Sequence, residues 1–140
     1  MKIVNERIKV QTTGYFQFVN LDAQIQLAVD KSEIKEGFLL LRSPHNTATI
    51  VCLDDNPAER DELKSTLSRL VMFDLDWDKA PREIKAERAR QAAAIIGQAH
   101  WSPIIDGKIG LGPWQSFFLL EFLEGRERLV EIAIVGGGNL

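Results

Sequence analysis

The sequence predicts a single α+β domain in which antiparallel β-sheets, packed like a sandwich, carry two to three helices. Short apolar or alternating segments recur along the chain between turn residues, which is typical of strands that pair antiparallel. Helical patterns lie between groups of strands, which favours α+β over a regular alternation of strand and helix. With 140 residues, 45% of them hydrophobic, the chain is long enough for one buried core.

One long apolar segment, Trp114–Phe122, is predicted to be the central strand of that core. Gln115 and Glu121 are the polar residues near its two ends. A strand that is apolar at nearly every position is buried on both faces. Shortly before it, Asp106-Gly107 is a tight-turn signal, because glycine accepts a positive φ at little cost. This turn predicts a hairpin between the strands on either side of it.

The first half of the chain predicts four strands and one helix. Apolar and polar residues alternate in the later part of the first strand. The helix follows Asn20, whose side chain can accept a hydrogen bond from the first turn. Apolar residues then recur with helical spacing from Leu21 to Val29. The predicted elements are strands over 2–12, 15–19, 38–42 and 47–53 and a helix over 20–31.

Two further helical segments are predicted before the last strands. Asn56 and Pro57 mark the start of one, as a cap residue followed by proline at the first helical position. Pro81 opens the other, and Gly97 is a typical stop for it. The remaining predictions are strands over 98–105 and 129–135, a domain over 1–135, and a flexible Gly-rich tail over 136–140.

Composition excludes several functional classes. The net charge of −3 argues against nucleic-acid binding, which requires an excess of positive charge. No apolar stretch approaches the roughly 20 residues of a membrane span, and the first residues are too charged for a signal peptide. The single cysteine, Cys52, excludes an internal disulfide framework. We therefore expect a cytoplasmic protein that binds neither nucleic acid nor membrane.

Three polar residues near the predicted strand ends are candidates for function. His45 follows Pro44 at a break between strands, where an imidazole could face a cleft and act as a general acid or base. The alternative is a structural, hydrogen-bonded histidine. Thr47 could donate to a phosphate, or it could serve only strand propensity. Asp54, at the end of the next strand, is a candidate magnesium ligand or simply the approach to a helix cap.

Two motifs carry a family resemblance. The segment Gly107–Phe122 matches G-x-L-x-L-G-x-W-Q-x-x-x-x-x-E-F except at Ile109, and Pro44–Ala48 is close to P-H-T-T-A. Leu53-Asp54 stands where that second motif is followed by N-E, and Arg126–Arg128 matches an Arg-x-Arg pattern. On these residues, and over essentially its whole length, the chain resembles a divergent member of the YjbQ-like family. Members of this family are described as secondary thiamine-phosphate synthases or as uncharacterised proteins.

The chain departs from the family at two histidines. Family members usually carry one after an acidic loop, and the corresponding segment 74–78 contains none. The other lies in N-A-D-A-H on the third helix, where this chain has Arg90, with Ala86 in place of the Asn. Arginine is a permanent cation that binds phosphate or carboxylate bidentately but cannot replace a titratable base. We hypothesise an anion pocket of Arg90, His45 and Arg126; the alternative is a solvated basic helix face.

The resemblance implies an enzyme that joins a hydroxymethylpyrimidine diphosphate to a thiazole phosphate and releases pyrophosphate. His45 would be its acid–base group, Arg90 and Arg126 would neutralise the phosphates, and Asp54 would be a possible magnesium ligand. One alternative is a non-catalytic scaffold that binds an anion or small molecule, as the loss of two histidines suggests. Another is a metal-dependent hydrolase. The substrate-binding candidates are Asn46, Thr47, Arg90, Gln115, Glu121 and Arg126.

The same resemblance implies a homotrimer with its sites near the subunit boundaries. It also implies that the ligand is a small phosphorylated molecule, with magnesium as the only cofactor to consider. His100 matches neither of the missing family histidines. The sequence leaves open whether His100 reaches the same cleft.

Overall fold

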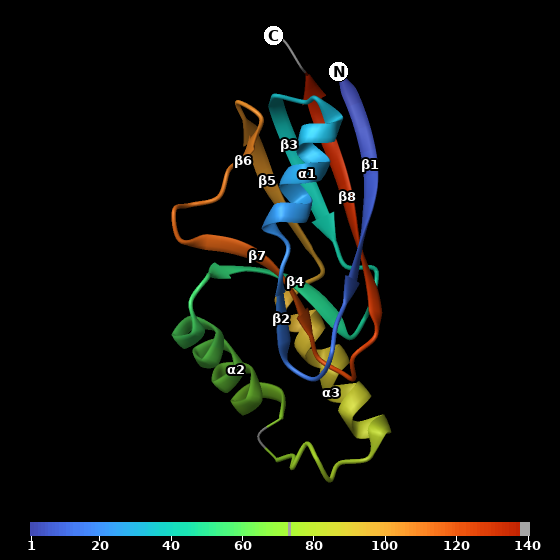
Figure 1. Ribbon diagram of the computed structural model, residues 1–140. Helices are drawn as coiled ribbons and strands as arrows, with labels where there is room; N and C mark the ends of the chain where they lie inside the picture. The colour runs from blue at the N-terminus through green and yellow to red at the C-terminus, as the bar shows by residue number, and fades with distance from the viewer. Residues whose placement is uncertain (73, 138–140) are drawn as a thin grey trace.

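The computed structural model describes residues 1–72 and 74–137, and Figure 1 shows how their elements are arranged. Strands dominate the fold, and the helices fall between groups of strands as predicted. The elements in chain order are β1 (Lys2–Gln11), β2 (Gln17–Asn20), α1 (Asp22–Ser32), β3 (Glu36–Arg42), β4 (Ala48–Asp54), α2 (Pro57–Val71), α3 (Arg82–Ile96), β5 (Ala99–Ile105), β6 (Lys108–Ile109), β7 (Gln115–Glu121) and β8 (Glu127–Gly137).

The strands form two antiparallel sheets, which confirms the predicted α+β class. The larger sheet has the order β1-β8-β3-β5-β6, and the smaller has the order β2-β7-β4. The predicted hairpin is present, since Ile104 of β5 pairs with Ile109 of β6 across the turn. At that turn Asp106 and Gly107 both have positive φ, as a two-residue hairpin connection requires.

The smaller sheet is the middle layer of the domain. Side chains alternate across β7, so that Phe117 and Leu119 join a core shared with α1 and the larger sheet. Phe118 and Leu120 join a second core beneath α2 and α3. All residues from Ser116 to Phe122 are therefore buried, which confirms a central strand covered on both faces over this range. The predicted start was wrong, because Trp114 precedes β7 and its side chain is 76% exposed.

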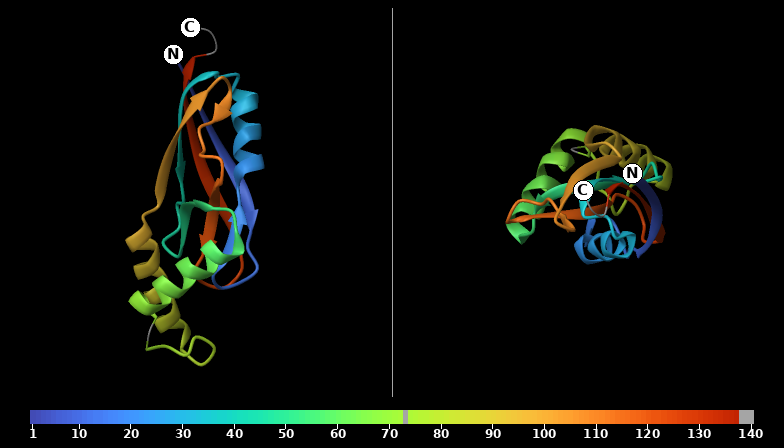
Figure 2. Two further views of the ribbon diagram at one scale, coloured as in Figure 1. Left: turned by 90° about the vertical axis from the view of Figure 1, so that its left-hand side faces the viewer. Right: turned by 90° about the horizontal axis from the view of Figure 1, so that it is seen from above.

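The helices cover different layers, as Figures 1 and 2 show. α1 lies along the larger sheet, whereas α2 and α3 lie together at the end of the molecule remote from the chain termini. Asn56 caps α2 as predicted, because its side chain accepts a hydrogen bond from the backbone N–H of Glu59 at 3.1 Å. In the part of the chain that the structure describes, no helix is both long and apolar enough to cross a membrane.

The structure extends the domain beyond the predicted boundary at residue 135. β8 continues to Gly137, because Gly136 pairs with both Lys2 of β1 and Gly37 of β3. A Cβ atom at Gly37 or Gly136 would collide with the opposing backbone, so glycine permits a close approach of the strands there. Residues 136 and 137 thus belong to a strand and not to a tail. The predicted tail residues 138–140 lie outside the described residues.

Candidate functional site

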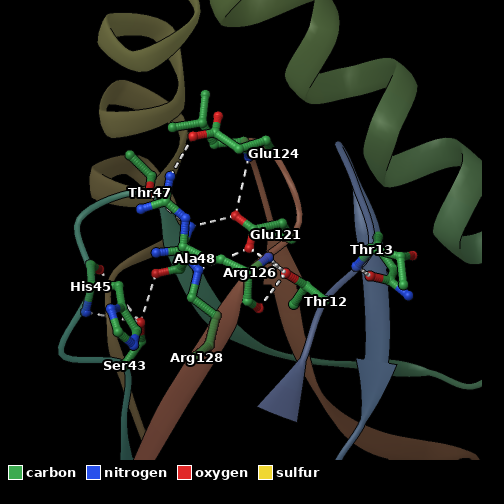
Figure 3. A network of polar contacts seen from close by, with 12 residues as sticks. Thr12, Thr13, Ser43, His45, Thr47, Ala48, Glu121, Glu124, Arg126 and Arg128 are labelled. Carbon is green, nitrogen blue, oxygen red and sulfur yellow. Dashed lines mark hydrogen bonds and ion pairs between the residues drawn. The ribbon is translucent and has the colours of Figure 1, made fainter.

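A buried ion pair joins the two sheets where β7 and β8 lie close together (Figure 3). Glu121 is the last residue of β7, and Arg128 is near the start of β8. The Arg128 guanidinium donates from Nε to Glu121 Oε1 at 2.8 Å and from Nη2 to Oε2 at 2.5 Å. Their side chains are only 2% and 0% exposed, respectively. This bidentate geometry is the strongest form of ion pairing between the two residue types.

Two threonines and a backbone amide complete the hydrogen bonding of this pair. Thr12, which follows β1, donates from its hydroxyl to Glu121 Oε1 at 2.7 Å. The N–H of Leu123 donates to Glu121 Oε2 at 3.1 Å. Thr47 accepts from Arg128 Nη2 at 2.8 Å. The buried charges are thus neutralised and hydrogen-bonded, as burial of an ion pair in a low-dielectric interior requires.

His45 occupies the place that another residue of β3 would take beside β8. The ladder between these strands ends at Arg42 opposite Glu131. Beyond it, the backbone N–H of Leu129 donates to His45 Nε2 at 2.9 Å. Nε2 must therefore be the unprotonated nitrogen, and in the neutral ring the proton is on Nδ1. Burial first, and then the positive charge of Arg128, lower the pKa of His45 below its ordinary value of 6.5.

One nitrogen of the buried guanidinium remains available. Arg128 Nη1 makes no hydrogen bond to any residue within the described ranges. Over those ranges no fully buried side-chain nitrogen or oxygen lacks a partner, so Nη1 retains a slight solvent exposure although Arg128 is only 2% exposed. The Nδ1–H of His45 is likewise free of any protein acceptor that the structure describes. The geometry thus leaves two donors, one of them on a cation, close to the same buried network.

Arg126 and Arg90 differ in their relation to this network. The backbone N–H of Arg126 donates to Thr12 at 3.0 Å, and its guanidinium forms an ion pair with Glu124. Arg126 also contributes to the lowered pKa of His45, so its charge is felt there. Arg90 is exposed on α3 and has no ion pair among residues 1–72 and 74–137. The structure therefore associates Arg126 with His45 and gives Arg90 the geometry of a solvated residue.

The remaining substrate-binding candidates divide between two ends of the smaller sheet. Asn46 is exposed beside His45, and Thr47 is buried against Arg128. Gln115 opens β7, whereas Glu121 closes it, so the two lie about 20 Å apart along the strand. The Gln115 side chain instead accepts from the backbone N–H of Gly112 at 2.9 Å. Gln115 is thus remote from the buried pair, although Gln115 and Glu121 are an even number of positions apart and lie on the same face of the strand.

Asp54 also lies at the remote end of the smaller sheet. It pairs with Gln115 across the ladder and borders a surface hollow of about 280 Å³ with Asp55, Asn56 and Trp114. Asp55 is already engaged by Arg60 at 2.6 Å. The described residues include no group of three or more His, Cys, Asp or Glu residues that could hold a metal ion. Asp54 thus lies apart from His45 and the buried pair, and its role as a magnesium ligand stays a prediction.

Two members of the network were missed as functional candidates from sequence. Thr12 follows an ordinary strand and gives no local signal. Arg128 was visible in the Arg-x-Arg pattern, but the first arginine was selected. The useful signal was Glu121 itself, because a carboxylate at the end of an otherwise buried strand requires a cationic partner.

His100 is a separate feature of the structure. It lies on β5, opposite Leu41 of β3, and its ring packs against Phe117 at a centroid distance of 6.1 Å. Burial lowers its pKa below 6.5. It therefore has the surroundings of a packed aromatic ring and shares no described hydrogen bond with His45.

Comparison with known proteins places this arrangement in a family. The family model for UPF0047 protein YjbQ-like matches residues 6–137. A UPF0047 protein of Methanothermobacter thermautotrophicus is 22% identical over 136 residues, covering 97% of this chain and 94% of the relative. The UPF0047 protein YugU of Bacillus subtilis is 25% identical over 133 residues, covering 92% and 97%, respectively.

Solved structures agree with the sequence comparison. A YbjQ-like protein of unknown function from Sulfolobus solfataricus has a TM-score of 0.87 at 28% identity, with 97% of this chain and 99% of the other covered. An uncharacterised YjbQ/UPF0047 protein from Clostridium acetobutylicum has a TM-score of 0.82 at 25% identity, with 93% of this chain and 99% of the other covered. The family match over residues 6–137 and the agreement of the fold with these solved structures lead to one conclusion: this chain belongs to the UPF0047 YjbQ-like family.

Proposed function

We propose that this chain binds a small phosphorylated ligand where His45 and Arg128 meet, without the group-transfer chemistry of a synthase. The observation that carries the proposal is the unpartnered Nη1 of the buried Arg128 guanidinium. Guanidinium and imidazole N–H groups are both suitable donors to phosphate oxygens. We call the group of His45, Thr47, Glu121 and Arg128 the anion site.

The charge around the anion site favours a modest anion affinity. The carboxylate of Glu121 offsets most of the positive charge of Arg128, and the carboxylate of Glu124 offsets most of that of Arg126. An incoming phosphate would therefore gain mainly from directed hydrogen bonds and less from net charge. This balance suits a phosphate monoester better than a large polyanion, for which several unpaired cations would be required.

The argument against group transfer rests on protonation and on metal binding. His45 is neutral near pH 7 because its pKa is lowered, and its one basic nitrogen is occupied by the Leu129 amide. A general base needs a free lone pair within reach of substrate. Two family histidines are absent from the sequence, and Asp54 lies at the remote end of the sheet. Nothing within the anion site thus replaces the missing acid–base groups.

The second candidate is retained thiamine-phosphate synthase activity. It is favoured by the intact Pro44-His45 segment and by the buried Glu121–Arg128 pair within the family motifs. In that case Arg128 and Arg126 would stabilise the departing pyrophosphate, because charge develops on the leaving group in the transition state. The Nδ1–H of His45 would then act as a hydrogen-bond donor.

Titration calorimetry tests the binding proposal directly. Inorganic phosphate, pyrophosphate and thiamine phosphate would each be titrated into wild-type protein and His45→Ala, with His100→Ala as the matched histidine control. We expect binding of at least one probe that His45→Ala weakens about tenfold, which corresponds to about 1.4 kcal/mol. His100→Ala and Arg90→Ala should bind as the wild type does. Equal affinity in His45→Ala and wild type, or no binding of any probe, would refute the anion site.

Direct product detection separates the two candidates. Wild-type protein would be incubated with magnesium, the pyrimidine diphosphate and the thiazole phosphate, beside His45→Ala. Ligand binding without thiamine phosphate formation supports the binding protein. Product formation that depends on His45 would replace that proposal with the synthase.

We further propose that the protein is a cytoplasmic homotrimer that binds neither nucleic acid nor membrane. The family resemblance supports the assembly, and the net charge of −3 supports the absence of a nucleic-acid partner. Cys52 is a free thiol, which is compatible with a reducing compartment. Light scattering coupled to size exclusion would give the mass of the assembly, and a monomer at all concentrations would contradict the trimer.

A further inference from the structure

We infer that the hollow at the start of β7 binds a small organic cation, with an alkylammonium head group held between Trp114 and Asp54. The hollow measures about 280 Å³ and is bordered by Asp54, Asp55, Asn56 and Trp114. Figure 1 shows this end of β4 and β7 beside the first turn of α2. Glu121 is at the opposite end of β7, so the inference is separate from the phosphate binding proposed above.

Trp114 is exposed although its backbone is held in place. Its side chain is 76% exposed, whereas its carbonyl accepts a hydrogen bond from the N–H of Asp55 at 2.9 Å. The turn beside it is closed twice, because the N–H of Gln115 donates to the carbonyl of Gly112 at 3.1 Å and the N–H of Gly112 donates to Gln115 Oε1 at 2.9 Å. A fixed backbone thus presents an indole at the border of the hollow. The face of an indole carries negative charge density that attracts organic cations.

Asp54 supplies a carboxylate that no other residue uses. Its side chain is partly buried, and it forms no hydrogen bond or ion pair within residues 1–72 and 74–137. Its oxygens are accessible to solvent, since over the same ranges no fully buried side-chain oxygen lacks a partner. By contrast, Asp55 forms an ion pair with Arg60 at 2.6 Å, and the side chain of Asn56 caps α2. The free negative charge at the hollow is therefore that of Asp54.

The surroundings of the hollow carry an excess of negative charge. Arg60 is engaged with Asp55, whose carboxylate also accepts a hydrogen bond from Asn20 at 3.3 Å. Burial first, and then the charges of Asp22 and Asp54, raise the pKa of the Cys52 thiol. The field of these two carboxylates thus reaches into β4. A cation entering the hollow would be attracted both by this field and by the indole.

The chemistry of the hollow favours an organic cation over other small ligands. The carboxylates of Asp54 and Asp55 would repel an anion. The first turn of α2 does not reverse this preference, because Pro57 has no N–H and Asn56 already accepts from the N–H of Glu59. Magnesium prefers oxygen ligands, to which an indole contributes nothing. Only a cation with apolar substituents uses the carboxylate and the indole together.

The size of the hollow favours a small molecule over a protein segment. A volume of about 280 Å³ is at the lower limit of ligand pockets and has room for a head group. Its border is polar except for Trp114, whereas a specific protein interface buries roughly 800 Å² on each partner around an apolar centre. The occupant is thus a small molecule whose alkyl groups contact the indole and whose charge faces Asp54.

An NMR titration with tetramethylammonium tests the inference on the full chain. The sequence contains three tryptophans, and the indole N–H of Trp101, 67% exposed, is the internal control for Trp114. At constant ionic strength we expect a saturable shift of the Trp114 indole and none of the Trp101 indole. Asp54→Asn should weaken binding about threefold, as a solvent-accessible cation site predicts. Asp78→Asn, which changes the net charge equally at an exposed position on the α2–α3 connection, should bind as the wild type does.

Saturation transfer from the protein to the methyl protons of tetramethylammonium measures the variants of Trp114. Trp114→Leu should weaken binding about threefold, and Trp114→Phe should retain part of it because an aromatic face remains. Circular dichroism would show that each variant is folded; should Trp114→Leu fail to fold, Trp114→Phe and Asp54→Asn carry the test.

Four outcomes would overturn the inference. They are the absence of a saturable Trp114 shift, an equal shift of Trp101, an equal response to sodium or magnesium at the same ionic strength, and unchanged affinity in Asp54→Asn. Tighter binding of N-acetyl-lysine amide than of tetramethylammonium would replace the small molecule with a protein side chain. The phosphate titrations described above are independent of each of these outcomes, because the anion site lies at the other end of β7.

Discussion

Replacing Arg128 with methionine should destabilise the protein more than most single substitutions. Glu121 has four hydrogen-bond donors, of which Arg128 supplies two. Loss of two hydrogen bonds to a charged group costs about 1.5–3 kcal/mol each, and breaking a buried ion pair from one side typically costs about 3–5 kcal/mol in total. We therefore expect the free energy of unfolding of Arg128→Met to fall by about 3–5 kcal/mol.

Urea denaturation at neutral pH measures this change, and a thermal melt provides a second estimate. For a chain of this length, the melting temperature falls by about 3 °C for each kcal/mol lost from the free energy of unfolding. The melting temperature of Arg128→Met should therefore fall by roughly 10–15 °C. The variant Glu121→Leu/Arg128→Met removes both charges. It should recover much of the loss, because no buried charge is left without its partner.

The reasoning would be refuted by a small effect of the single substitution. A loss below about 1 kcal/mol in Arg128→Met would mean that water or backbone rearrangement compensates the Glu121 carboxylate. A double variant no more stable than Arg128→Met would mean that the cost comes from packing around the long arginine side chain and not from its charge.

Three further predictions concern His45, Asn56 and Glu124. His45→Ala leaves a backbone amide unpaired and should cost about 1–2 kcal/mol in urea denaturation. The pKa of His45 is lowered in the folded state, so the unfolded chain takes up the proton first as pH falls below 6.5. The stability of the wild type should therefore decrease below pH 6.5, and that of His45→Ala should decrease less. Asn56→Ala should cost about 1 kcal/mol through loss of the α2 cap, without a change in ligand affinity. Arg82 lowers the pKa of Glu124 from 4.5 to about 2, so the ion pair should stabilise the protein above 4.5 and be lost as pH falls towards 2; an NMR titration of Arg82→Ala should move that pKa back towards 4.5.

Most of the fold could be predicted because local signals and burial agreed. The β5–β6 turn, the Asn56-Pro57 helix start and the apolar β7 strand each have a local cause that survives in the tertiary structure. The end of β8 could not be predicted, since Gly136 reads as a flexible residue. Its role depends on the close approach of Gly37 from a strand about a hundred residues earlier. Sequence patterns contain no direct information on such distant backbone contacts.

The candidate site was predictable only in part, for the same reason. Gln115 and Glu121 were both candidates as the polar residues of one apolar strand, but the two ends of that strand are too far apart to share a ligand. Thr12 lies 109 residues from Glu121 along the chain and gives no local signal of the hydrogen bond that joins them. The tautomer of His45 depends on a backbone amide 84 residues away. The residue type was enough to select His45 as a candidate. Its protonation and its tautomer, however, depend on contacts that form only in the folded chain.

The order of the larger sheet has a consequence for synthesis on the ribosome. β8 follows every other strand in the chain, yet it lies between β1 and β3 and pairs with both. β1 has no other neighbour in the sheet, so the first strand to be made must wait for the last before it can form a ladder. We therefore expect folding to be completed only after β8 has emerged. Until then, the apolar inner residues of β1 and β3 would be accessible to chaperones or to other nascent chains.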